Sequence, residues 1–339
     1  MGRPFGLLPQ ELESTAIDRW EVAPSERIFI PPAIRLPGQM ERIRGTEFGT
    51  VEAVMRDLRG GFEAEMGQTL GFRLTGVDLV DGVLYGAQAV KHLRPRERLM
   101  PAYLVPTEVT RGAMYESWVG NRWFGNWLSD DCLTYPLAAA YGDPVTSSLV
   151  RTGHVPDYED RLGIEPRRID RVHFEELILF RDTAHNASRR ARADSFRARL
   201  IGGREPERHP GVFLLRGGTG AERILMNERA IAERLAAEHG FRVLDPSTAP
   251  LSKIVEACGG ASIVAGVEGS HLVHGLMLMP RKATLMVVQP PERAVSVLKM
   301  ITDRQGQRYA FVVATGDGVR FSAEWSEIVR TVDLILKEA

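Results

Sequence analysis

The sequence has few of the features that mark specialised classes of protein. Its only two cysteines, Cys132 and Cys258, stand outside any CxxC or Cys/His pattern. We therefore expect a reducing compartment, with neither a disulfide scaffold nor a zinc site. No run of about 18 apolar residues occurs, and the first residues lack the apolar core of a signal peptide. These absences predict a cytoplasmic protein without a membrane-spanning helix.

A large excess of charge of one sign is also missing. The chain has 43 basic and 44 acidic residues, which gives a formal net charge of −1. No global field would therefore recruit nucleic acid, and we expect no nucleic-acid partner. A polyanion would have to be bound locally. The composition is that of a globular protein, and 339 residues suggest about two domains.

Two common phosphate-binding motifs are absent as well. The sequence contains no GxxxxGK[ST] loop and no GxGxxG dinucleotide fingerprint. This argues against a P-loop enzyme, and it weakens the hypothesis of an oxidoreductase on a dinucleotide-binding domain. A phosphate-binding site in this protein would therefore have to be formed by other residues and backbone groups.

The first half of the chain is irregular in its pattern. Residues 1–45 are rich in proline and predict an arm wrapped over a surface. Residues 72–91 alternate apolar and polar side chains around an Asp-Gly pair, which predicts a β-hairpin. Residues 171–180 predict a strand, and residues 186–200 predict a basic, exposed helix.

The second half alternates regularly between short apolar runs and helical segments. This alternation is typical of a parallel α/β unit with helices on both faces. The expected strands are 212–216, 241–244, 261–265, 284–288 and 309–313, and the expected helices are 227–239, 251–258, 269–279 and 293–301.

The segment 202–210 is dominated by Gly, Pro and charge, and it is the best candidate for a linker. We therefore predict an N-terminal domain over 1–205 and a second domain over 206–321. Residues 322–339 predict a helix that packs back across the domains.

A turn follows the expected strand 261–265, at the edge where doubly wound sheets bind ligands. Gly269, Ser270 and His271 would offer free N–H groups suited to a phosphate. His271 and His274 are three residues apart, and either is also explained as a hydrogen-bonded core residue. Glu268 is interpreted as a partner for a base or sugar hydroxyl, or as a carboxylate that stabilises the helix dipole.

Two arginines lie beside a glycine-rich loop after the first strand of this half. Arg216 ends that strand, and Arg223 precedes the pair Asn227-Glu228. Two guanidinium groups can hold a diphosphate by charge-assisted, bidentate hydrogen bonds. The alternative is a glycine-rich surface turn with solvated arginines.

Four ordered motifs make the stretch 212–280 similar to the donor-binding half of glycosyltransferase family 61. They are Arg216, the sequence RILMNE that begins at Arg223, the segment GFRVLDP over 240–246, and the turn GVEGSHLVH over 266–274. In the first half, FGNWLSDDCL over 124–133 is similar to the family's aromatic-Gly-His-Trp-Leu segment. Asn126 stands where that segment commonly has His, and Glu268 stands where many members have His.

The resemblance implies an α/β fold of GT-B type, with two Rossmann-like domains facing across a cleft. It implies an inverting glycosyltransferase that moves a sugar from a nucleoside diphosphate sugar to a hydroxyl of a glycan or lipid-linked acceptor. Many such enzymes build bacterial capsule or other surface polysaccharide. A lipid-linked acceptor would place the protein at the inner face of the membrane, and peripheral association through the basic helix 186–200 is left open.

Inverting transfer requires a general base and a cationic site for the departing diphosphate. Asp130 and Asp131 are candidate bases because adjacent like charges raise one pKa, although a helix-start pair explains them too. Asn126 and Trp127 are candidate acceptor contacts, with ordinary packing as the alternative for the tryptophan. No cofactor and no metal are expected, because arginines and backbone amides can neutralise the leaving group.

The site residues are thus assigned to three groups. The catalytic candidates are Asp130, Asp131, Glu268 and His271; the donor-binding candidates are Arg216, Arg223, Asn227, Gly269, Ser270 and His274; and the acceptor-binding candidates are Asn126 and Trp127. The base remains open among the three carboxylates. The alternative function is a catalytically inactive carbohydrate- or nucleotide-binding protein of polysaccharide assembly.

Overall fold

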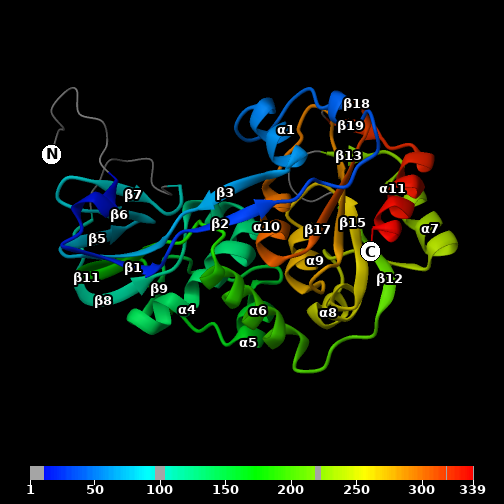
Figure 1. The fold of residues 1–339 in the computed structure, drawn as a ribbon. Coiled ribbons are helices and arrows are strands. Elements are labelled where there is room, and N and C mark those ends of the chain that lie inside the picture. Colours follow the sequence, from blue (N-terminus) through cyan, green and yellow to red (C-terminus); the bar gives the residue numbers. More distant parts are fainter. Residues whose placement is uncertain (1–10, 96–103, 218–222, 318, 339) are drawn as a thin grey trace. The chain divides into compact units, whose positions relative to one another are not determined.

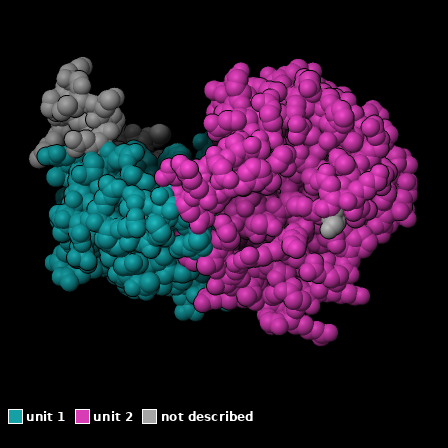
Figure 2. All heavy atoms as spheres, viewed as in Figure 1, with its two compact units in different colours: residues 1–25, 67–189 teal, residues 26–66, 190–339 magenta. Residues whose placement is uncertain are grey.

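The computed structural model describes residues 11–95, 104–217, 223–317 and 319–338 (Figure 1). The chain divides into two compact units (Figure 2). Unit 1 contains the chain up to Ser25 and then Gly67–Arg189, and unit 2 contains Glu26–Met66 and Arg190–Ala339. The chain therefore passes between units at three places, whereas the sequence pattern predicted one change near 205.

Unit 1 contains a nine-stranded mixed sheet in the order β10-β9-β8-β11-β5-β6-β7, with β4 also paired to β11 and β1 to β4. The strands are β1 (Asp18–Ala23), β4 (Thr69–Leu74), β5 (Val77–Val80), β6 (Val83–Tyr85), β7 (Val90–His92), β8 (Glu108–Met114), β9 (Pro144–Thr146), β10 (Arg167–Arg168) and β11 (Arg171–Arg181). Only the pairs among β8, β9, β10 and β11 are parallel.

This sheet corrects the expectation of a Rossmann-like fold in the N-terminal half. A Rossmann sheet is mostly parallel, whereas five strand pairs of unit 1 are antiparallel. Tight turns are one reason. Asp81 and Gly82 have φ angles of 54° and 70°, so they form the primed type of turn that joins antiparallel strands. The predicted hairpin is confirmed there as β5 and β6.

The helices of unit 1 are short, and four of them lie within the segment 117–141. They are η1 (Leu12–Thr15), α2 (Trp118–Arg122), α3 (Phe124–Asn126), the π-helical turn η3 (Trp127–Asp131), α4 (Cys132–Tyr141) and α5 (Val155–Leu162). The π-helical turn holds the two candidate aspartates. Such turns are rare and often occur at functional sites.

The predicted helix over 186–200 is confirmed as α6 (Ala187–Ile201), but it is not exposed along its length. Arg189 is 1% exposed, and Phe196 and Leu200 are also buried. Arg189 is buried because it pairs with the carboxylates of Asp130 and Asp182. The prediction of an exposed basic face is therefore wrong at this arginine.

Unit 2 contains a five-stranded parallel sheet in the order β14-β12-β15-β16-β17. Its strands are β12 (His209–Leu214), β14 (Phe241–Leu244), β15 (Ala261–Val267), β16 (Thr284–Gln289) and β17 (Arg308–Val313), and its helices are α7 (Glu228–His239), α8 (Leu251–Gly259), α9 (Leu272–Leu278), α10 (Val297–Gln305) and α11 (Trp325–Lys337). The predicted α/β alternation is confirmed, although α10 begins four residues later than expected.

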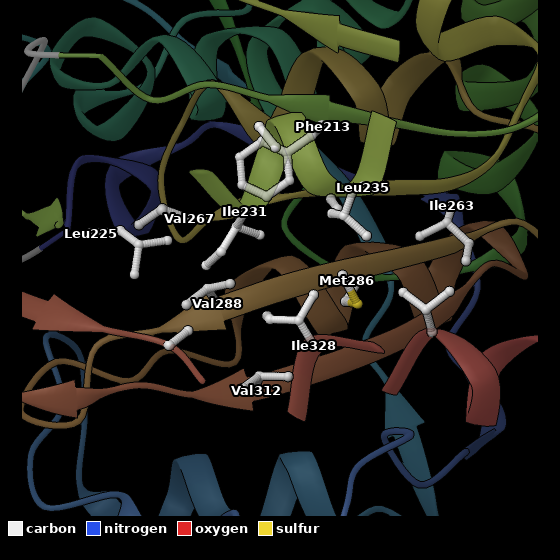
Figure 3. Packing of buried hydrophobic residues seen from close by; sticks show 14 of the residues in the cluster. Phe213, Leu225, Ile231, Leu235, Ile263, Val267, Met286, Val288, Val312 and Ile328 are labelled. Atoms are coloured by element: carbon white, nitrogen blue, oxygen red, sulfur yellow. The ribbon is translucent and has the colours of Figure 1, made fainter. Parts of the chain in front are cut away.

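The core of unit 2 forms where one sheet face meets α7 and α11 (Figure 3). Phe213, Ile263 and Met286 come from the strands, and they pack with Leu235 of α7 and Ile328 of α11. Buried apolar residues on one stripe of α11 explain why this helix docks on the sheet. These contacts lie within unit 2, and packing of the last helix across the domains stays a prediction.

The segment 26–66 is the N-terminal contribution to unit 2. It forms an antiparallel pair, β2 (Glu26–Ile30) with β3 (Phe62–Met66), the short turn η2 (Met40–Arg42) and helix α1 (Val51–Arg59). Between β2 and α1, the N–H of Ile34 donates to Tyr309 O at 2.9 Å, and its carbonyl accepts from Phe311 N at 3.1 Å. We call residues 31–48 the arm. It runs along the edge strand β17. The expected arm covered residues 1–45, but residues 18–23 form β1 of unit 1 and residues 26–30 form β2, while residues 1–10 lie outside the described residues.

A small three-stranded sheet completes unit 2, with β13 (Ile224–Leu225), β19 (Arg320–Ser322) and β18 (Thr315–Gly316) in that order. Among the helices of the described residues, none combines the length and apolar character that crossing a bilayer requires.

Candidate functional site

Three arginines gather where the strands of the unit 2 sheet end. Arg216 follows β12, Arg223 precedes β13, and Arg293 follows β16. Parallel strands bring their carboxyl ends to one edge, so the loops that follow them converge. The Arg216 side chain is 7% exposed, and its Nη1 donates to the backbone oxygen of Glu268 at 3.2 Å.

Gly269 makes this position of Arg216 possible. A Cβ built on Gly269 would overlap Nη1 of Arg216, so any side chain there would push the guanidinium away. The glycine identified in the sequence therefore acts through close packing against the arginine.

Arg223 is the most strongly perturbed arginine of the cluster. The pKa of Arg223 is lowered to about 9, mainly by burial and also by the nearby charges of Arg216 and Arg293, against which the charge of Glu47 acts. Its guanidinium pairs with the carboxylate of Glu268, and both side chains are 10% exposed. Its Nε is buried without a hydrogen-bond partner. A buried group of cations that repel one another favours an anion.

Arg216 has a second carboxylate beside it. Glu228 begins α7, and its Oε1 accepts from the backbone N of Arg216 at 2.9 Å. Burial lowers the pKa of Arg216, the charge of Glu228 raises it, and Arg293 lowers it. Burial in turn raises the pKa of Glu228. This carboxylate fixes the loop that carries Arg216.

Asn227, a predicted donor contact, is engaged elsewhere. Its Nδ2 donates to Ala323 O at 2.8 Å, and its Oδ1 accepts from Ala323 N at 3.3 Å. These two bonds tie the start of α7 to the segment before α11. A donor contact by Asn227 stays a prediction, and it would compete with this structural role.

The two predicted histidines differ in their surroundings. His271 is half-buried directly before α9, and its Nε2 has no hydrogen-bond partner. Burial lowers the pKa of His271 to about 3, and the charge of Arg216 adds to this. The ring is therefore neutral at neutral pH. His274 is 3% exposed within α9, all of whose residues are buried, and Ser270 is half-buried in the turn.

In unit 1, Asp130 lies at the accessible end of a polar network. Its side chain is 30% exposed, Oδ2 accepts from Asn126 Nδ2 at 2.8 Å, and Oδ1 accepts from Arg189. Arg189 also contacts Asp182 at 3.4 Å, and Asp182 accepts from the Thr69 hydroxyl at 3.0 Å. Two carboxylates therefore share one buried guanidinium.

Asp131 is in a different environment, although it is the next residue. It is 2% exposed and accepts from Ser117 N at 3.2 Å and Ser117 Oγ at 2.7 Å. Burial raises the pKa of Asp131 well above its usual value, and the Ser117 hydrogen bonds lower it. Ser117 caps α2, so Asp131 supports the start of that helix.

Trp127 packs in an aromatic cluster of unit 1. Its ring centroid is 5.8 Å from that of Phe124 and 6.4 Å from that of Tyr158. The ring is half-buried. These contacts fit the packing alternative, and acceptor binding by Trp127 stays a prediction.

The sequence analysis missed Arg293 and Glu47, which belong to the same cluster. The Arg293 guanidinium pairs with the carboxylate of Glu47, a residue of the arm. Arg293 had a signal, because it follows a strand whose loop was expected at the ligand edge. Glu47 had none, since only the fold brings residue 47 beside residue 293. Within the described residues, no group of three or more His, Cys, Asp or Glu is placed to hold a metal ion.

Two solved structures resemble parts of the chain. The flavodoxin of Streptococcus pneumonia TIGR4 is 12% identical and has a TM-score of 0.26. Its alignment covers 38% of this chain and 99% of the flavodoxin. The metal-soaked Flv1 flavodiiron core from Synechocystis sp. PCC6803 is 12% identical, covers 75% and 58%, and has a TM-score of 0.27. Scores this low carry no argument about fold or function.

A search of curated proteins gave no match. The family profile described as Glycosyltransferase 61 matches residues 98–287, which is more than half of the chain. The match includes the π-helical turn η3 of unit 1 and the cluster residues Arg216, Arg223 and Glu268 of unit 2. The chain therefore belongs to the glycosyltransferase 61 family.

Proposed function

We propose that the protein is an inverting glycosyltransferase that uses a nucleoside diphosphate sugar as donor and a hydroxyl group of a glycan or lipid-linked glycan as acceptor. The observation that carries this proposal is the cluster of Arg216, Arg223 and Arg293 at the carboxyl edge of the parallel sheet. Cations held together at that edge are a suitable site for the diphosphate of a donor.

The cluster would act on the leaving group. As the sugar is transferred, negative charge grows on the diphosphate oxygen that leaves, and guanidinium groups fixed nearby stabilise that charge. Because three arginines supply the positive charge, the reaction would need neither a metal ion nor an organic cofactor. The neutral ring of His271, with an unpaired Nε2, would donate a hydrogen bond rather than a charge.

Asp130 is the carboxylate that best fits the general base. It is more exposed than Asp131, and Asn126 and Arg189 orient it while each oxygen keeps a further acceptor position. Glu268 is less suitable because Arg223 already holds it. Asn126 and Trp127 lie on the same short segment as Asp130, which suits contacts to an acceptor sugar.

The wider role proposed is assembly of bacterial capsule or another surface polysaccharide. The protein would act in the cytoplasm, and peripherally at the inner face of the membrane when the acceptor is lipid-linked. An arrangement with donor and acceptor domains across a cleft, as in GT-B enzymes but with a mixed sheet in place of a Rossmann-like acceptor domain, belongs to the same proposal. In that arrangement the α/β unit 2 is the donor domain.

Calorimetric titration with UDP-, GDP- and CMP-sugars tests the proposal. We expect one class of donor to bind in the presence of EDTA, and transfer to acceptor with inversion at the anomeric carbon by NMR. Absence of binding by every donor and every nucleoside diphosphate would contradict it. Donor binding without transfer or hydrolysis would instead favour the inactive binding protein, the alternative suggested by Asn126.

A further inference from the structure

The arm brings one more carboxylate to the arginine cluster. Its backbone is fixed beside the loop after β16: Arg44 N and Gly45 N both donate to Pro291 O, at 2.8 and 3.2 Å, and Ala294 N donates to Gly45 O at 3.0 Å. This pairing delivers Glu47 to the guanidinium of Arg293.

Each arginine of the cluster is thereby matched by one carboxylate. Glu228 lies beside Arg216, Glu268 pairs with Arg223, and Glu47 pairs with Arg293. Among the residues that the structure describes, three carboxylates thus lie beside the three arginines before any ligand binds. A diphosphate that enters this cluster must therefore take the place of at least one carboxylate, because a carboxylate left beside it would repel it.

The pair that can exchange most easily is the most exposed one. The side chains of Arg293 and Glu47 are 27% and 31% exposed, whereas those of Arg223 and Glu268 are both 10% exposed. Breaking a buried pair leaves an unpaired buried charge, whereas a partly exposed carboxylate regains water. The Nε atoms of Arg293 and Arg223 are also buried without a partner, so each offers a donor that the carboxylates do not use.

We propose that Glu47 is an internal counter-ion of the donor site, which the diphosphate replaces at Arg293. The arm thus sets the affinity of the site for anions: a ligand binds well only when its charge and hydrogen bonds outweigh the Glu47–Arg293 pair. This inference rests on the proposed donor site, and it adds Arg293 as a phosphate contact and Glu47 as a residue that determines specificity.

The test is calorimetric titration of inorganic pyrophosphate into the full-length protein and its variants at fixed ionic strength. Glu47→Gln removes the competing carboxylate while keeping its size, and we expect pyrophosphate to bind about three- to tenfold more tightly. Arg293→Gln should weaken binding by about tenfold. In the double variant Glu47→Gln/Arg293→Gln, the first substitution should no longer tighten pyrophosphate binding, because no guanidinium remains at position 293 to be freed from Glu47.

Glu41→Gln is the matched control. Glu41 is an exposed residue of the same arm, so this variant removes the same charge without touching the Glu47–Arg293 pair. We expect less than a twofold change. Glu47→Asp keeps the counter-ion and should stay near wild-type affinity. Thermal unfolding of each variant shows that the fold is retained.

Three results separate the two proposals. If pyrophosphate binding depends on Arg216 but Glu47→Gln leaves it unchanged or weaker, the counter-ion is overturned and the donor site stands. If Glu47→Gln tightened pyrophosphate binding equally in the Arg293→Gln background, the proposed exchange of Glu47 for phosphate would also be overturned. The gain would then reflect net charge alone. If neither the wild type nor Glu47→Gln binds pyrophosphate, both proposals are wrong.

Discussion

The two units combine the same residue types in different proportions. In unit 1, Asp130 and Asp182 share the single buried guanidinium of Arg189. In unit 2, Arg293 lies close enough to lower the pKa of Arg216, and both of these arginines lower the pKa of Arg223. A cluster with two carboxylates to one guanidinium suits acceptance of a proton, whereas a cluster of neighbouring arginines, each with one carboxylate beside it, suits an anion that replaces a carboxylate. The number of carboxylates for each guanidinium, rather than the mere presence of ion pairs, thus indicates which chemistry a cluster can support.

The largest change in stability is expected from removing Arg189, the arginine at the centre of the unit 1 network. Arg189→Met leaves Asp182 buried without its cation, since both side chains are 2% exposed. We expect a loss of about 3–5 kcal/mol in the free energy of unfolding. Urea unfolding measures it. A loss below 1 kcal/mol, on the order of a surface pair, would show that the unit 1 cluster is not a structural network.

In unit 2, the corresponding change should affect function and spare the fold. Arg216→Ala removes a cation of the arginine cluster, and we expect donor-dependent transfer to fall by a factor on the order of 100 or more. Initial rates with saturating acceptor measure it, with thermal unfolding as the check on folding. Transfer at wild-type rates would remove Arg216 from the site.

The adjacent aspartates sharpen the comparison within unit 1. Asp130→Asn should lower kcat on the order of 100-fold with little change in stability, because it removes a base that is 30% exposed. Asp131→Asn should retain more activity and lose about 1–2 kcal/mol of stability, because it weakens the hydrogen bonds from Ser117. Kinetics and urea unfolding of both variants check this. The reverse pattern would make Asp131 the base.

A smaller effect on donor binding is expected when the close packing of Gly269 against Arg216 is disturbed. Gly269→Ala should weaken donor binding by about tenfold, because its Cβ displaces Nη1 of Arg216. Gly306→Ala is the control: its φ is +66°, so it carries backbone strain, yet nothing lies within 4 Å of its Cβ. Calorimetry should show wild-type donor affinity for the control. Equal affinities in both variants would contradict the contact.

The smallest effect concerns pH. Burial lowers the pKa of His271 to about 3 from its usual 6.5, so the unfolded chain binds a proton that the folded protein does not between those values. Stability from this group is present above about pH 6.5 and is lost as the pH falls towards 3. His271→Gln should flatten this dependence by less than about 1 kcal/mol per pH unit. Unfolding curves at pH 5 and 7 measure it, and an unchanged slope would show that the pKa of His271 is not lowered.

The sequence predicted unit 2 better than unit 1, for a physical reason. Strands covered on both faces read as continuous apolar runs, and β15 is almost entirely buried, so its place and the turn after it could be predicted. The mixed sheet of unit 1 depends on pairings such as β1 with β4, which join distant segments that no local pattern connects.

The same reason limits how much of the candidate site could be predicted from the sequence. Arg216, Arg223 and Glu268 were identifiable because each follows or precedes an element with a clear pattern. Glu47 was not, because its partner is 246 positions away in the chain. Arg189 was misjudged as solvated because a helix rich in arginine gives no sign of which arginine will meet buried carboxylates.

The central claim is that the unit 2 arginine cluster holds the diphosphate of a nucleotide sugar. A crystal structure of the protein with its nucleoside diphosphate tests this most directly. We expect phosphate oxygens within about 3 Å of guanidinium nitrogens of Arg216 and Arg223, with Glu47 turned away from Arg293. A diphosphate bound elsewhere, with the Arg223–Glu268 and Arg293–Glu47 pairs intact, would contradict it.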